Sequence, residues 1–224
     1  MEGDFDARTV VLFDGFDPMD VIAPYEVLGA GGLVTGGLLE VELVAAEGAR
    51  EVPSGVPPVS LRATGALDPQ RADMIIVPGA MGRMPTSSDD YGDDSVLTVL
   101  ARTLDTGLPA LLKEAMDRPG LTMVSVCGGS LVLALAGLLT GRPTTTHPLG
   151  MDALAATGAL AVDARVVDDG DLICGAGVTS GLDVGLYLLE RELGPRIAHA
   201  VEKLLAYERR GTVWQNTGST PIPV

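Results

Sequence analysis

Hydrophobic and polar positions change along the chain in a pattern that predicts alternating strands and helices. Short apolar or alternating runs rich in β-branched residues predict strands at 8–13, 39–45, 73–77 and 121–126. Helical spacing predicts helices at about 19–28, 95–116 with a break at Gly107 and Pro109, 130–139, 148–156, 180–193 and 195–210. Turn residues predict hairpins at 56–67 and 161–174. Strands alternating with helices favour an α/β sandwich around a mainly parallel sheet.

The length and composition of the chain indicate one domain. It has 224 residues, 46% hydrophobic content and neither a repeat nor a low-complexity tract, which suffices for one buried core. We therefore expect a single domain over residues 1–224, with a core at about 8–210 and an irregular tail at 211–224.

Charge narrows the classes of partner. The formal net charge is -15 and the isoelectric point is near 4.3, so a phosphate backbone or an anionic membrane would be repelled. The first residues show no basic leader, and no segment has the length and apolarity of a membrane span. We expect a cytoplasmic protein that binds neither nucleic acid nor membrane.

The two cysteines differ in their settings. In the stretch "VSVCGGSLVLALAGLL" at 124–139, a buried strand meets a helix at Cys127, with glycines directly after it. A strand-turn-helix of this kind is typical of a nucleophile elbow, and the nearby helix N-terminus predicts a lowered thiol pKa. The alternative is that Cys127 is a small buried residue that packs the strand end. Cys174, at the end of a hairpin arm, is expected to be structural.

Other catalytic chemistries find little support in the sequence. No G-x-S-x-G elbow, phosphate-binding glycine loop or dinucleotide motif occurs, and His147 and His199 lie far apart. Covalent catalysis by Cys127, without a metal or an organic cofactor, is the chemistry that remains.

Three segments carry a resemblance to a known family. The elbow at 124–139, followed by "GRPTTTH" at 141–147, resembles the ThiJ/PfpI superfamily, which is class I glutamine amidotransferase-like, and within it the isonitrile hydratases. The segments "FDPMDVIAPYEVL" at 16–28 and "VVDDGDLICGAGVTSGLD" at 166–183 resemble two further blocks of that family. The resemblance covers about residues 8–210 and implies a flavodoxin-like, three-layer α/β sandwich with a mainly parallel sheet.

The resemblance also implies roles for individual residues. Cys127 matches the nucleophile and Asp20 a catalytic acid, while the amides of Gly79 and Gly128 match donors that stabilise a developing anion. His147 matches a histidine that the superfamily keeps at this distance from the cysteine.

Each role has a structural alternative. Asp20 could cap a helix, Asp14 and Asp17 could be turn residues, and His147 could be a structural histidine with satisfied hydrogen bonds.

The chain departs from the hydratase pattern in three places. Gly128 stands where the hydratases have threonine, Ala80 replaces the second glycine of Pro-Gly-Gly, and residues 94–119 form an expansion suited to a lid or a dimer surface.

The resemblance implies hydration of an isonitrile, a small molecule, to an N-substituted formamide through a thioimidate on Cys127, in a homodimer. Glyoxalase-like, deglycase-like or amidase-like cysteine chemistry, or a non-enzymatic ligand sensor, are the alternatives.

Overall fold

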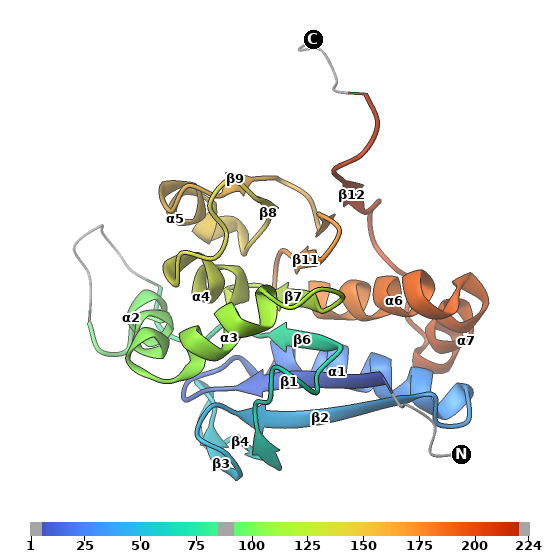
Figure 1. Cartoon of the computed structure of the whole chain (residues 1–224), viewed down its shortest axis with the longest axis horizontal. Helices are drawn as coiled ribbons and strands as arrows, with labels where there is room; N and C mark the ends of the chain where they lie inside the picture. The colour runs from blue at the N-terminus through green and yellow to red at the C-terminus, as the bar shows by residue number, and fades with distance from the viewer. Residues whose placement is uncertain (1–5, 85–91, 220–224) are drawn as a thin grey trace.

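An eight-stranded sheet forms the centre of the computed structural model, which describes residues 6–84 and 92–219 (Figure 1). Positions 1–5, 85–91 and 220–224, which include part of the loop after Gly79 and the end of the tail, lie outside the described residues. The strand order is β12-β10-β11-β7-β6-β1-β2-β5, and every neighbouring pair is parallel except β10 and β11. The strands of this sheet are β1 (Asp6–Leu12), β2 (Leu39–Ala45), β5 (Gly65–Ala66), β6 (Met74–Val77), β7 (Thr122–Val126), β10 (Val166–Asp168), β11 (Leu172–Gly175) and β12 (Trp214–Gln215).

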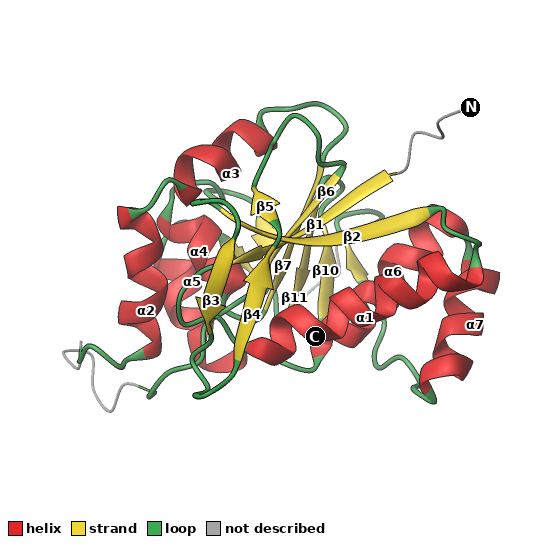
Figure 2. Cartoon of the chain, turned by 90° about the horizontal axis from the view of Figure 1, so that it is seen from below, coloured by secondary structure: helices red, strands yellow, loops and turns green. Residues whose placement is uncertain are grey.

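Helices cover both faces of the sheet, as Figure 2 shows. One face carries three helices that pack on one another, α1 (Pro18–Val34), α6 (Ser180–Leu193) and α7 (Pro195–Leu205). The other face carries α2 (Val96–Arg102), α3 (Leu108–Met116), α4 (Gly129–Leu135) and α5 (Met151–Ala156). The expected three-layer α/β sandwich is therefore confirmed.

Several smaller elements lie outside the main sheet. An antiparallel hairpin consists of β3 (Arg50–Pro53) and β4 (Ser60–Ala63), and a short parallel pair consists of β8 (Pro143–Thr144) and β9 (Leu160–Ala161). Two 3-10 turns, η1 (Thr103–Asp105) and η2 (Pro148–Gly150), follow α2 and precede α5. The hairpin at 56–67 thus begins earlier than predicted, whereas the β10-β11 hairpin lies where its turn residues predicted it.

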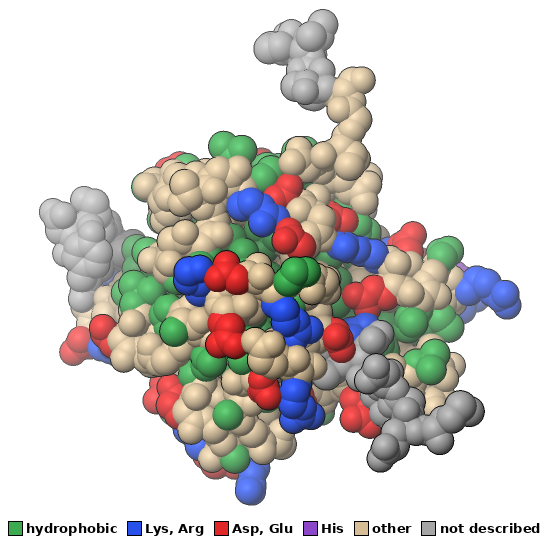
Figure 3. All heavy atoms as spheres, in the orientation of Figure 1, with side chains coloured by type: hydrophobic (Ala, Val, Ile, Leu, Met, Phe, Trp, Pro, Cys, Tyr) green, Lys and Arg blue, Asp and Glu red, His purple; other side chains and the backbone are tan. Residues whose placement is uncertain are grey.

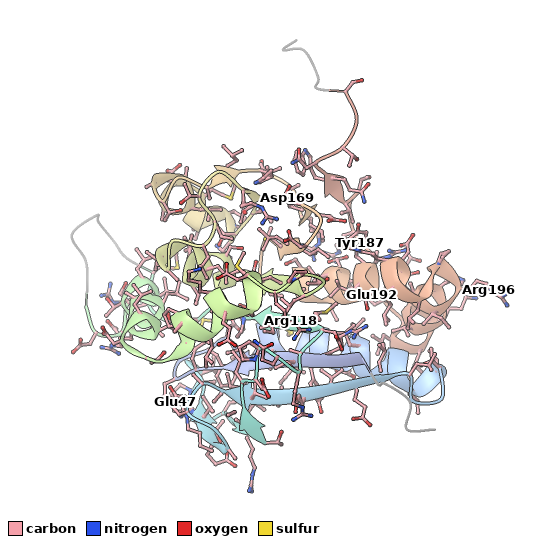
Figure 4. All side chains as sticks on the ribbon, in the orientation of Figure 1. Glu47, Arg118, Asp169, Tyr187, Glu192 and Arg196 are labelled. Atoms are coloured by element: carbon pink, nitrogen blue, oxygen red, sulfur yellow. The ribbon has the colours of Figure 1, made fainter. Side chains whose placement is uncertain are left out.

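The tail is more ordered than predicted. Trp214–Gln215 form β12, which pairs in parallel with β10. Figure 4 labels Tyr187 and Asp169, which hold this segment: the side-chain amide of Gln215 donates to Tyr187 Oη at 3.0 Å, and that of Asn216 donates to Asp169 at 2.9 Å. A two-residue strand is specified by such contacts and has no periodicity of its own.

Charged side chains on the surface are mixed rather than segregated. Acidic and basic groups are intermixed on the face in Figure 3. Ion pairs of this kind include Arg142 with Asp169 at 2.5 Å and with Asp171 at 2.6 Å. Inside the sheet, the buried Arg8 of β1 pairs with Glu192 of α6. Among the residues that the structure describes, no helix combines the length and apolarity that a bilayer crossing requires.

Close packing of α1 against α6 depends on a glycine. A Cβ added to Gly185 would lie 2.8 Å from Cβ of Val27, whereas one added to the exposed Gly29 of α1 would meet no atom within 4 Å.

We therefore expect Gly185→Ala to lower the free energy of unfolding by about 1–3 kcal/mol through overpacking. Gly29→Ala is the matched control and should raise it by about 0.5–1 kcal/mol, because alanine favours the helix. Urea unfolding measures both changes, and equal effects of the two substitutions would contradict this account of the α1-α6 contact.

Candidate active site

Cys127 occupies a sharp turn between β7 and α4. Its φ of 56° lies in the left-handed region, which costs a non-glycine residue about 1–2 kcal/mol. Two hydrogen bonds hold this conformation: Cys127 N–H donates to the Gly175 carbonyl at 2.9 Å, and the Thr146 hydroxyl donates to the Cys127 carbonyl at 2.8 Å. Only a glycine fits at position 129, because an added Cβ would lie 2.0 Å from the Val77 carbonyl oxygen. The segment is therefore the predicted elbow in its backbone geometry.

Asp20 lies in the first turn of α1 and is fully buried. One carboxylate oxygen, Oδ2, accepts a hydrogen bond from Gly79 N–H at 2.9 Å. The other, Oδ1, makes no hydrogen bond of normal geometry with the described residues, although the Cys127 thiol is close enough for each group to affect the other's pKa. Asp20 is not the helix cap, because Asp17 fills that position and accepts from Met19 N–H at 2.9 Å.

Gly79 brings the acid and the elbow together. A Cβ at this position would lie 2.5 Å from Gly128 N and 2.8 Å from Asp20 Oδ2. Any larger residue would therefore push the end of β6 away from both groups. This proximity puts the turn before α1, the end of β6 and the elbow in one place, although they are far apart in the sequence.

Cys127 opens onto a cavity of about 310 Å³. Its walls are mainly apolar, and α2 contributes one side of them with Val96, Leu97 and Leu100. The expansion at 94–119 thus supplies part of the cavity wall. The complete lining is Asp17, Ala80, Met81, Gly82, Met84, Val96, Leu97, Leu100, Cys127, Gly128, Leu131, His147, Leu149, Gly150, Ala153 and Val178.

Burial and like charge set the protonation of the central pair. Desolvation, followed by the negative charge of Asp20, raises the pKa of the Cys127 thiol, and the N–H of Gly128 offsets only part of this rise. Desolvation and the charge of Asp17 raise the pKa of Asp20 well above its ordinary 3.8. The sequence prediction of an acidified thiol is therefore wrong, because burial and two carboxylates outweigh the short helix α4. Each effect disfavours the ionised form of its group, and the negative charge of ionised Asp20 opposes loss of the thiol proton.

Asp17 and His147 face the same cavity. Asp17 is 3% exposed, and burial raises its pKa against the opposing effects of the amide donors and of His147. His147 is half-buried and accepts the N–H of Leu149 on Nδ1 at 3.2 Å. His147 is both the pocket residue and the structural residue that the sequence left open.

The remaining predicted residues divide between the cavity and its surroundings. Gly128 and Ala80 line the cavity, as does Cys127, whereas the Gly79 amide is directed at Asp20 rather than at a substrate. This differs from the anion-stabilising role predicted for Gly79, because the motif does not show that the carboxylate takes this donor. Cys174 is fully buried beside hydroxyl groups of β7 and α4, as expected for a structural residue.

Sequence reasoning missed Asp17 as a residue of the site. Its sequence signal, an aspartate directly before Pro18 at a helix start, is typical of a cap, and the side chain does cap α1. Among the described residues, no three His, Cys, Asp or Glu side chains are grouped in a way that could hold a metal ion.

We expect Asp20→Asn to accelerate alkylation of Cys127 by a neutral reagent at pH 8. Removing the nearby negative charge lowers the thiol pKa, and below that pKa each unit of decrease raises the thiolate fraction about tenfold. Peptide mass analysis gives the rate at Cys127. Glu26→Gln removes an exposed carboxylate from the same helix and should leave the rate unchanged; a slower reaction in Asp20→Asn would contradict the assignment.

Asp20→Asn should also stabilise the protein increasingly as the pH rises. Because the folded-state pKa of Asp20 is raised, the folded protein holds a proton that the unfolded chain loses above about 3.8, so the wild type loses stability as the pH increases toward the folded pKa. The asparagine variant lacks this loss. Urea unfolding from pH 4 to 8 measures the free energy of unfolding of both proteins. A difference between them that becomes smaller as the pH rises would contradict the raised pKa of Asp20.

Comparisons with known proteins place the chain in a family. The model of the DJ-1/PfpI family matches residues 9–191. Isonitrile hydratase from Pseudomonas putida is 32% identical over 198 residues, which cover 88% of this chain and 76% of that protein. The HTH-type transcriptional regulator CdhR from Pseudomonas aeruginosa is 29% identical over 86% of this chain and 52% of its own length.

A solved structure agrees with these matches. A THiJ/PfpI family protein from Pseudomonas syringae superposes with a TM-score of 0.72 at 28% identity, covering 96% of this chain and 79% of that chain. Because the family model spans most of the chain, and the elbow and sheet have the geometry that the resemblance implied, the chain belongs to the DJ-1/PfpI family.

Proposed function

We propose that this protein hydrates an isonitrile to an N-substituted formamide, with Cys127 as the nucleophile and Asp20 as its proton partner. The observation that carries the proposal is a buried thiol beside a buried carboxyl group at one end of an apolar cavity, where the pKa of each group is raised. The 32% identity to a relative named isonitrile hydratase supports the same reaction.

The chemistry of an isonitrile suits a protonated thiol. Its terminal carbon accepts both a nucleophile and a proton, so addition of a thiol needs the S–H proton to stay in the site. As the sulfur attacks, the S–H bond breaks and Asp20 takes the proton. A C–S bond forms, and the protonated Asp20 returns the proton to the same carbon. The product is a neutral thioimidate, R–N=CH–S–Cys127.

Water completes the reaction. Its oxygen adds to the thioimidate carbon while one proton goes to the nitrogen, with Asp20 as the acceptor and donor closest to the sulfur. The C–S bond then breaks, the sulfur regains a proton, and R–NH–CHO leaves. Asp20 is fully buried and does not line the cavity, so it acts on atoms bound to or next to the sulfur.

A ligand-sensing role is the second candidate. The match to the regulator CdhR extends over 86% of this chain, and an apolar cavity suits binding without reaction. Turnover distinguishes the two, because a sensor would bind a ligand without consuming it.

The cytoplasmic location and the homodimer stay predictions. Met19, Ile22 and Leu33 of α1 are exposed apolar side chains that a second copy could cover.

The test is incubation of the protein with a simple alkyl and a simple aryl isonitrile, followed by quantification of the formamide. We expect Cys127→Ala to lose at least about a thousandfold in rate, because the covalent step disappears. Asp20→Asn should lose about a hundredfold or more, because asparagine cannot carry the proton, even though its thiol alkylates faster.

The control is Cys174→Ala, which removes the other thiol from a fully buried position outside the cavity and should retain the rate. Formamide production that survives Cys127→Ala would refute the covalent mechanism. Stoichiometric binding of an isonitrile without formamide would favour the sensor.

A further inference from the structure

The cavity in front of Cys127 has an electrostatic character that the proposed reaction does not itself require. Apart from Asp17, Cys127 and His147, its lining consists of aliphatic side chains, methionines and glycines. No Lys or Arg side chain lines the cavity, and the sequence outside the described residues contains neither type. A ligand carboxylate in this cavity would therefore find no ammonium or guanidinium group to pair with.

Asp17 lies in this wall, and its ionised form places a negative charge at the cavity. Its carboxyl group is 3% exposed and is held by the N–H of Met19 at 2.9 Å, so it has a fixed position at the cavity. The field of this group already reaches the reacting atoms, because it contributes to the perturbation of both Asp20 and Cys127. In a poorly solvated cavity, such a field is screened far less than at the surface.

From this arrangement we infer that Asp17 is a specificity-determining residue that excludes anionic molecules and reserves the cavity for substrates whose remaining part is an uncharged hydrocarbon group. The apolar walls stabilise the hydrocarbon group by removing it from water, and the cavity of about 310 Å³ limits its size. The inference rests on the proposed function in naming isonitriles of this kind as substrates, but the exclusion of anions is a property of the cavity itself.

A pair of alkylating reagents tests the exclusion without any isonitrile. Iodoacetamide and iodoacetate are close in size and attack the same sulfur with loss of iodide, but only iodoacetate is anionic. The measured quantity is the rate with iodoacetamide divided by the rate with iodoacetate, both at Cys127. This ratio is compared with the same ratio for glutathione in the same buffer. Because both reagents react with the thiolate, a change in the pKa of Cys127 cancels in the ratio.

We expect the rate ratio at Cys127 of the wild type to exceed the glutathione ratio by tenfold or more. Asp17→Asn should lower the ratio at Cys127 by about tenfold, because one charge acts at short range in a site of intermediate dielectric constant. Asparagine is as good a helix cap as aspartate, so α1 should keep its N-terminus. Asp14→Asn is the matched control: it removes the same charge from an exposed position beside Arg50, outside the cavity, and should leave the ratio unchanged.

A wild-type ratio equal to that of glutathione, or an equal ratio in Asp17→Asn and wild type, would overturn the inference. A second arm compares hydration of 4-isocyanobenzoate with that of its methyl ester, for which we expect the ester to be preferred and Asp17→Asn to narrow the preference. If neither compound is hydrated but the alkylation ratio behaves as expected, the proposed function fails while the exclusion of anions stands.

Discussion

The hydrogen bond from Gly79 N–H to Asp20 is the contact on which the site depends. It joins the first turn of α1 to the end of β6, and Gly79 in turn touches the backbone of Gly128 in the elbow. A carboxylate with a single amide donor among the described residues is an unfavourable group to bury, and folding tolerates it because the surrounding sheet is a large apolar core. The same cost raises the pKa of Asp20 next to the Cys127 thiol.

Elements with strong internal patterns could be predicted from the sequence, and those defined by tertiary contacts could not. The bounds of β2 and α6 agree with the predicted 39–45 and 180–193. Helix α4 ends earlier than predicted, at Leu135, because Gly137 adopts a φ of 77° that stops it. Helix α1 continues past Leu28 through several glycines, and an added Cβ at Gly32 would lie 2.6 Å from the Leu39 carbonyl oxygen. Helix propensity alone cannot predict that α1 continues through these glycines, because the requirement for glycine comes from tertiary packing.

The site shows the same division. The strand-turn-helix motif is sufficient to single out Cys127, because the elbow is set by local backbone geometry, whereas Asp20 is singled out only by the resemblance of residues 16–28 to the family. The protonation of the pair could not be predicted. A helix N-terminus predicts an acidic thiol, and only the folded structure shows that Asp20 and Asp17 lie close enough to reverse the effect. Asp17 was hidden for another reason, since its capping role gave a sufficient explanation of its identity.

The packing of Leu100 limits the side chain that position 128 can carry. The side chain of Leu100 is 1% exposed and its methyl groups lie 3.3 and 3.6 Å from where a Cβ of residue 128 would be. A threonine there, as in the hydratase motif, would compete with Leu100 for the same volume. The two positions are therefore coupled: a side chain added at position 128 would require the Leu100 side chain on α2 to shift by a few tenths of an ångström or to be smaller.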